Sequence, residues 1–148
     1  MNRTELKHYI LENYQAELDH PWAAYPHYEV FRHTNNRKWF ALIMDIPRNR
    51  LGLPGEAVLD VVNLKCDSIL IGSLLGEPGF FPAYHMNKGN WITVALDDDV
   101  PDETMKMLLD VSYAATAQRG KRQRGAVDLT LDNCGPDAYN ETKTPFPQ

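Results

Sequence analysis

The sequence has few of the features that usually identify an exported protein or a metal-binding one. Its only two cysteines, Cys66 and Cys134, are widely separated and form no CxxC or Cys/His zinc pattern. We interpret both as reduced thiols and expect no metal. No apolar run reaches the roughly 18 residues that cross a bilayer, and the N-terminal segment is too charged for a signal peptide. We therefore expect a cytoplasmic protein without a membrane segment.

Catalytic signatures are missing as well. The chain contains no HExxH, P-loop, GxSxG or GxGxxG motif, and its five histidines show no spacing typical of metal ligands. These absences predict a protein that is not an enzyme and holds no cofactor. A triad assembled in space from distant residues stays open at this stage, because spacing cannot identify one.

The composition is that of one globular domain with an acidic balance. The 148 residues are 43% hydrophobic and 24% charged, enough for one ordinary core. The net charge of −5 opposes attraction to nucleic acid unless the basic side chains gather on one surface. Residues 118–148 are polar and rich in turn residues, so we expect a mobile tail after a domain at 1–117. Only the AVDLTL segment of the tail could form a short strand.

Three helices are predicted. Asn2 and Glu5 can form a capping box for a helix over about 3–15, and Asp67 can cap a short helix through SILIGSLL. Pro101 suits the first turn of a helix that runs to about residue 117. The apolar faces of the two long helices are Leu6, Tyr9, Ile10 and Tyr14 in the first, and Met105, Leu108, Leu109, Ser112 and Ala115 in the last.

Alternating segments between the helices predict strands. YEVFRH and KWFALIMDI indicate a hairpin, AVLDVVNLKC a further strand, and residues 80–96 a strand pair around an NKGN turn. The proline-containing AELDHPWAAYPHY should be an irregular connection whose Trp22 and Tyr25 cover a core edge. In the hairpin, alternation places Phe40, Leu42 and Met44 on one face and Trp39, Ala41 and Ile43 on the other.

This order predicts a two-layer α+β fold, with an antiparallel sheet of about five strands and the N- and C-terminal helices on one face. Each terminal helix has one apolar stripe, so together they can cover only one face of the sheet. We therefore expect the other face to be available to water or to a partner.

Four segments together suggest a family. They are VVNLKCD (61–67), PAYHMNKGNW (82–91), VPDE (100–103) and SY (112–113). Their order and spacing resemble the MmcQ/YjbR family of small bacterial proteins, over residues 1 to about 117. The resemblance implies a CyaY-like fold, DNA binding and no established enzymatic activity. Many members have a histidine directly before the Trp of the turn, where this chain has Asn90.

The NKGN turn has a structural interpretation, which we favour, and a functional one. A positive φ at Gly89, and backbone hydrogen bonds from Asn87 or Asn90, would account for three of its four residues. They do not account for Lys88, which should be exposed at the tip near aromatic neighbours. A cation beside aromatic rings can engage phosphate and stack on a base.

The functional interpretation is a binding module that contacts DNA through an open sheet face and basic hairpin tips. Three lysines would be placed for phosphate, with aromatic rings for packing or stacking. The candidate residues are Lys38, Lys65, Tyr84, His85, Lys88 and Trp91. Asn63, which shares a strand face with Lys65, can instead bond a loop backbone. The alternative function is a module for a protein partner or a small ligand, without affinity for nucleic acid.

Two further charged groups favour structural interpretations. Two groups of basic residues could bind phosphate: Arg48 with Arg50 in the PRNRLGLPGE loop, and KRQR in the tail. Such surface side chains are more often simply solvated. The acidic residues before the last helix lack the register of a calcium loop, so the helix macrodipole and capping explain them better. They are Asp97, Asp98, Asp99, Asp102 and Glu103.

Overall fold

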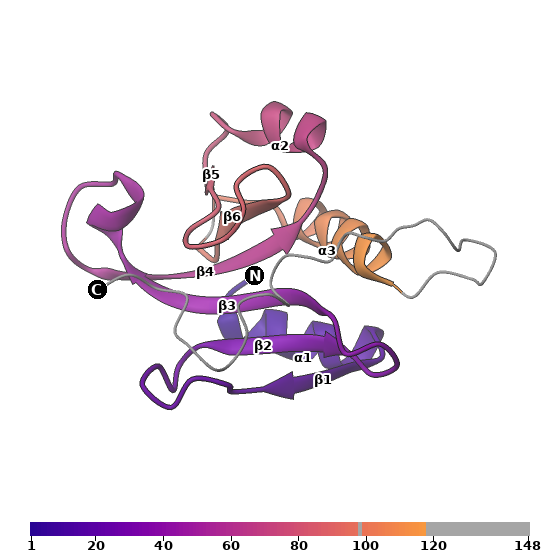
Figure 1. The fold of residues 1–148 in the computed structure, drawn as a ribbon. Helices are drawn as coiled ribbons and strands as arrows, with labels where there is room; N and C mark the ends of the chain where they lie inside the picture. The colour runs from indigo at the N-terminus through magenta and orange to yellow at the C-terminus, as the bar shows by residue number, and fades with distance from the viewer. Residues whose placement is uncertain (98, 118–148) are drawn as a thin grey trace.

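Residues 1–97 and 99–117 are described by the computed structural model (Figure 1). Their α-helices are α1 (Arg3–Asn13), α2 (Ser68–Leu74) and α3 (Asp102–Thr116), with one 3-10 helix, η1 (Arg48–Leu51). Their strands are β1 (Ala16–Asp19), β2 (Glu29–His33), β3 (Trp39–Pro47), β4 (Val58–Lys65), β5 (Phe80–Pro82) and β6 (Trp91–Ala95). The predicted α+β class is confirmed. The tail predicted for 118–148, with its KRQR and AVDLTL segments, lies outside the described residues.

All strands join one open antiparallel sheet in the order β1-β2-β3-β4-β6-β5. The described sheet has six strands rather than about five. The additional strand, β1, lies in a segment that we expected to be irregular, and it pairs with β2 from Ala16 opposite His33 to Asp19 opposite Val30. Its four residues are too few for period-two alternation to reveal, and tertiary pairing decides its conformation.

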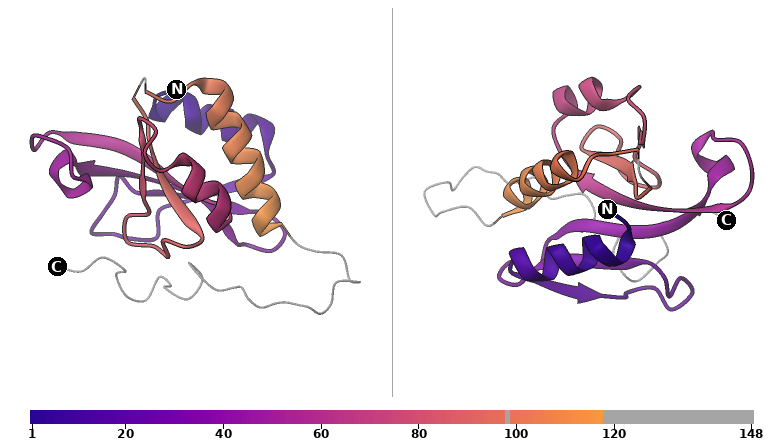
Figure 2. Two further views of the ribbon diagram at one scale, coloured as in Figure 1. Left: turned by 90° about the horizontal axis from the view of Figure 1, so that it is seen from above. Right: turned by 180° about the vertical axis from the view of Figure 1, so that it is seen from behind.

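The helices cover one face of the sheet, as predicted for the terminal two (Figure 2). The predicted capping box is present, because Asn2 Oδ1 accepts from Glu5 N at 2.8 Å and Glu5 Oε1 from Asn2 N at 2.9 Å. On α3, Thr116 is buried and Ala115 is exposed, which corrects the last position of the predicted apolar face. Helical spacing from Ser112 continues to Thr116, four residues on, rather than to Ala115.

A β-bulge in β3 changes which side chains share a face. Arg32 lies opposite Trp39 and Phe31 opposite Ala41, so Phe40 is the extra residue. Phe40 therefore packs beneath the helices with Ala41 and Ile43, while Trp39 shares the other face with Leu42 and Met44. The predicted grouping of Phe40 with Leu42 and Met44 is wrong because strict alternation cannot anticipate an inserted residue.

Ser112 of α3 bonds the backbone beside this bulge. Its hydroxyl donates to the carbonyl oxygen of Phe40 at 2.6 Å and accepts from the backbone N–H of Lys65 at 2.9 Å. The side chain is completely buried. One helix residue thus bonds backbone groups of both β3 and β4 just beyond the last pair of their ladder, Ala41 opposite Leu64. An unpaired buried backbone group would otherwise cost stability.

The second face of the sheet is buried too, which corrects the expectation that it is available to water or a partner. Val30, Met44 and Val61 on this face have no exposed surface. They belong to a second cluster of buried side chains, separate from the core beneath the helices. Alternate positions of the central strands are apolar on both sides, so each face requires a cover.

Aromatic rings from the segment before β2 pack on this second cluster. The ring of Trp22 lies edge-on to that of Trp39 at 5.5 Å and to that of Tyr28 at 6.2 Å. Tyr25 stacks on Tyr28 at 4.9 Å, and the guanidinium of Arg32 lies 5.6 Å from the Trp39 ring centre. The predicted role of Trp22 and Tyr25 in covering a core edge is confirmed.

Candidate functional site

The segment between β5 and β6 folds over the second face and is held there by Asn63. The side chain of Asn63, fully buried on β4, donates to the carbonyl oxygen of Tyr84 at 3.2 Å and accepts from the Thr93 hydroxyl at 2.5 Å. Thr93 Oγ1 in turn accepts from the backbone N–H of Tyr84 at 2.9 Å. The interpretation of Asn63 as a residue that bonds a loop backbone is confirmed.

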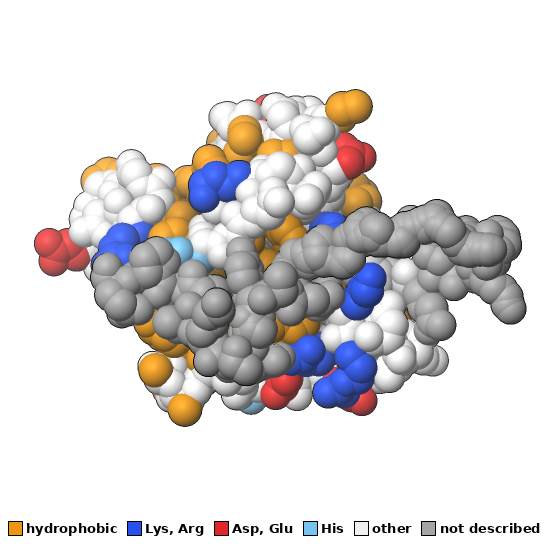
Figure 3. Space-filling model, viewed as in Figure 1, with side chains coloured by type: hydrophobic (Ala, Val, Ile, Leu, Met, Phe, Trp, Pro, Cys, Tyr) orange, Lys and Arg blue, Asp and Glu red, His pale blue; other side chains and the backbone are white. Residues whose placement is uncertain are grey.

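This tether brings Tyr84 and His85 to the loop that contains Arg50. Arg50 Nη1 donates to the Tyr84 hydroxyl at 3.0 Å, and the rings of Tyr84 and His85 are 3.9 Å apart. His85 has a φ of 60°, a left-handed conformation that is uncommon outside glycine. We call Arg50, Tyr84, His85 and Lys88 the cationic cluster. Figure 3 shows this face, with Lys, Arg and His side chains beside hydrophobic ones.

The cationic cluster has its charge on two of its members. Burial, together with the positive charges of Lys88 and Arg50, lowers the pKa of His85 to about 4. The imidazole is therefore neutral at pH 7, and the charge is carried by Arg50 and Lys88, both of which are exposed. Burial also raises the pKa of Tyr28 to about 12, with contributions from Asp45 and from the neighbouring Tyr84.

The NKGN turn follows the structural interpretation with one correction. Gly89 N donates to Asn87 Oδ1 at 2.8 Å, and Asn90 N and Trp91 N both donate to Asn87 O, at 3.2 and 3.0 Å. Gly89 does not take the predicted positive φ; within this segment that conformation is found at His85 instead. Lys88 lies exposed in the turn, as predicted.

The other predicted contact residues are placed less favourably. Trp91 is 1% exposed and belongs to the second buried cluster, so its ring packs in the protein and cannot stack on a base. Lys65 ends β4 opposite Trp91, and Lys38 directly precedes β3, which is the strand next to β4. Lys38, Lys65 and Lys88 therefore lie at or near the ends of neighbouring strands. Burial lowers the pKa of His33, and the charge of Lys38 lowers it too, although the His33 ring bonds Thr116 of α3 on the helix side.

In the sequence, Arg50 is only one of two arginines in the PRNRLGLPGE loop. The signal for it was its position in an exposed loop rich in glycine and proline. The convergence of that loop with Tyr84 depends on a hydrogen bond between residues 34 positions apart, which no local pattern could reveal.

The family-like motifs have structural roles in this chain. Asn63 tethers a loop, Ser112 bonds two strands, and Tyr113 stacks on the buried ring of His33 at 4.1 Å. Cys66 is a buried free thiol whose pKa is raised by burial to about 11, so it is a poor nucleophile. Cys134 lies outside the described residues.

The acidic residues before α3 provide charge but no cap. The N-cap is Pro101, which makes no side-chain cap hydrogen bond, so the predicted capping is wrong while the favourable charge of Asp102 and Glu103 in the first turn remains. Across residues 1–97 and 99–117, no three His, Cys, Asp or Glu side chains are grouped so as to hold a metal ion. None of the described helices has the length and apolar character needed to span a bilayer.

Comparison with known proteins agrees with this fold. The YjbR family model matches residues 11–115. "Uncharacterized protein YyaQ" of Bacillus subtilis (strain 168) is 34% identical over 116 residues, which cover 78% of this chain and 98% of YyaQ. A crystal structure of a protein from Pseudomonas syringae is 44% identical with a TM-score of 0.77, and the match covers 79% of this chain and all of that one.

A structure of lower sequence identity shows similarity in the fold alone. Protein DR2400 of Deinococcus radiodurans is 24% identical, with a TM-score of 0.62 over 80% of each chain. The resemblance seen in the NLKCD and YHMNK segments is confirmed by the family model, which spans both segments, and by the similarity to YyaQ. The chain belongs to the YjbR family.

Proposed function

We propose that this chain is a non-enzymatic binding module that contacts the phosphate backbone of DNA through the cationic cluster. The observation that carries the proposal is the convergence of Arg50 and Lys88, from two separate loops, on the rings of Tyr84 and His85. Among the described residues, the Arg50 side chain donates a hydrogen bond only to the Tyr84 hydroxyl, so it keeps further donors for phosphate. The sheet face itself takes no part, because it is buried.

The charge balance sets the strength of this contact. Residues 1–117 contain 10 Lys and Arg against 16 Asp and Glu, so attraction comes from a small cationic area on an acidic domain. If Arg50 and Lys88 each neutralise one phosphate, the slope of log K against log salt should be about −1.8. Lys65, at the end of the adjacent β4, can add to this surface. We expect weak binding without sequence preference.

An anisotropy titration of a fluorescein-labelled 20-base-pair duplex tests the proposal. Lys88→Ala and Arg50→Ala should each flatten the salt slope by about 0.9. Lys106→Ala is the matched control, because it removes the same charge from α3, where Lys106 lies over the ring of Tyr9. The proposal is overturned if no binding occurs at about 50 mM salt, or if the control weakens binding as much as Lys88→Ala does.

A further inference from the structure

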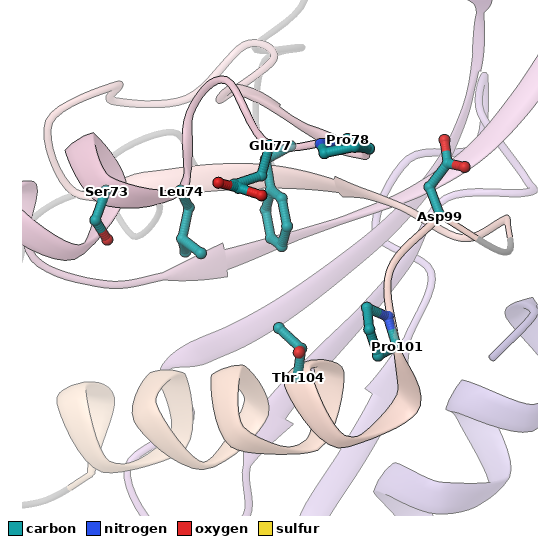
Figure 4. Close-up of a pocket in the computed structure, with 8 residues that line it drawn as sticks. Ser73, Leu74, Glu77, Pro78, Asp99, Pro101 and Thr104 are labelled. Atoms are coloured by element: carbon teal, nitrogen blue, oxygen red, sulfur yellow. The ribbon is translucent and has the colours of Figure 1, made fainter.

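A hollow of about 360 Å³ lies between α2, the segment that follows it, and the beginning of α3. Leu74 and Phe80 give it an apolar wall, Ser73 and Thr104 contribute hydroxyls, and Glu77 and Asp99 contribute carboxylates. Figure 4 shows Leu74 and Glu77 on one side, Thr104 on the other, and the carboxylate of Asp99 pointing away from Thr104. Phe80 also belongs to the core beneath the helices, so the hollow lies on the helix side of the sheet, opposite the cationic cluster.

The walls of the hollow are fixed by backbone contacts. Glu77 N donates to Leu74 O at 3.0 Å, and Phe80 N donates to Glu77 O at 3.2 Å. Gly79 O accepts from Ala95 N of β6 at 2.8 Å, so the segment that carries Glu77 is joined to the sheet. Gly79 also packs so closely on residues 99–100 that a Cβ there would lie 2.5 Å from Val100 Cγ2. A ligand would therefore meet a preformed site.

The charge of the hollow is not neutralised within the described part of the chain. Neither Glu77 nor Asp99 forms an ion pair among those residues, and both are exposed. The N-terminal ammonium of Met1, which is a nearby cation, is instead 2.8 Å from Asp102. Two carboxylates beside an apolar wall suit a long basic side chain, because its methylene groups can lie on the wall while its charged end meets the carboxylates.

Exposed apolar side chains extend the hollow along both helices. Ile69 is 84% exposed and lies four residues before Ser73, on the same side of α2. Met107 is 44% exposed and lies three residues after Thr104 on α3. A small polyamine would leave these side chains in water, whereas a peptide with apolar residues next to its basic ones would cover them.

We propose that the hollow between α2 and α3 binds a segment of a protein partner in which Lys or Arg alternates with apolar residues. The basic side chains contact Glu77 and Asp99, and the apolar ones contact Ile69, Leu74 and Met107. This surface is independent of the cationic cluster, so the chain can bind a basic protein segment on one side and phosphate on the other.

The test is an NMR titration of the ¹⁵N-labelled full chain with acetyl-Leu-Lys-Leu-Arg-Leu-amide. We expect saturable shifts of the backbone amides of Glu77, Gly79 and Thr104, and much weaker binding of acetyl-Leu-Gln-Leu-Gln-Leu-amide. Glu77→Gln and Asp99→Asn should each lower the affinity for the basic peptide about two- to fivefold. Glu56→Gln, which removes the same charge from an exposed loop elsewhere, should not.

A second pair of variants tests the apolar contacts. Ile69→Ser should weaken the binding of both peptides, whereas Leu11→Ser, at another exposed apolar position, on α1, should weaken the binding of neither. The proposal is overturned if the neutral peptide binds as tightly as the basic one, if the shifts lie outside the hollow, or if no amide shifts at all. It is also overturned if Glu56→Gln acts like Glu77→Gln. None of these outcomes bears on the DNA titration, which depends on residues of the other face.

Discussion

Replacing Gly79 by alanine should destabilise the fold by about 2–4 kcal/mol. Gly79 has a φ of +89°, which costs a residue with a Cβ about 1–2 kcal/mol. The new Cβ would lie 2.5 Å from Val100 Cγ2 and 3.3 Å from Asp99 Cβ, and Val100 is buried in the core. Overpacking of this kind costs about 1–3 kcal/mol, while the stiffer unfolded chain offsets about 0.4–1 kcal/mol.

Two other glycines distinguish the cost of a positive φ from the cost of the close contact with Val100. Gly76 has a φ of +101° but no atom within 4 Å of a Cβ, so Gly76→Ala should cost only about 1 kcal/mol. Gly72 lies in α2 without positive φ or close neighbours, so Gly72→Ala should stabilise by about 0.5–1 kcal/mol. Urea unfolding followed by tryptophan fluorescence measures all three. If Gly79→Ala loses no more stability than Gly76→Ala, the close approach to Val100 does not constrain the chain, and the reasoning is refuted.

Three further predictions concern buried groups. Asn63→Ala should lower the free energy of unfolding in urea by about 2–3 kcal/mol, because it leaves buried partners without hydrogen bonds. A decrease below about 1 kcal/mol would contradict the role of Asn63 in holding the segment between β5 and β6. Burial lowers the pKa of His33 below its unfolded value, so the unfolded chain binds more protons and stability falls as pH drops below about 6.5. His33→Gln should flatten that pH dependence, and an unchanged slope would assign it to other groups. In a Cys134→Ser variant, the remaining Cys66 should react with a thiol reagent only on unfolding, since fast reaction of the native chain would mean an accessible thiolate.

The sequence predicted the elements well where one local pattern decides them. The Asn2 capping box, the Asp67 cap that accepts from Leu70 N at 2.8 Å, and the hairpin of β2 and β3 all depend on residues close in the chain. It failed at the bulge, because a single inserted residue at Phe40 exchanges the faces of all the residues on one side of it. Strict period-two counting has no means to detect such an insertion.

In the candidate site, too, features set by neighbouring residues were predictable, whereas contacts between distant segments were not. The exposure of Lys88 follows from turn chemistry, and its closeness to His85 follows from a separation of three residues. Arg50 was not predicted to join them, and the burial of Trp91 was not foreseen, because both depend on how distant segments pack on the second face. A strand with apolar residues on alternate positions indicates that a face is buried, but not what covers it.

The bonds of Ser112 make one amide in the middle of the sheet a reporter on a helix. The N–H of Lys65 lies in a central strand, yet its partner is a hydroxyl on α3 and not a carbonyl of β3. Its exchange with deuterium should therefore be governed by separation of α3 from the sheet. The amide of Val62, in the regular part of the β4 ladder, should exchange only when the strands themselves separate. Two amides three residues apart thus record two different opening motions of the same domain.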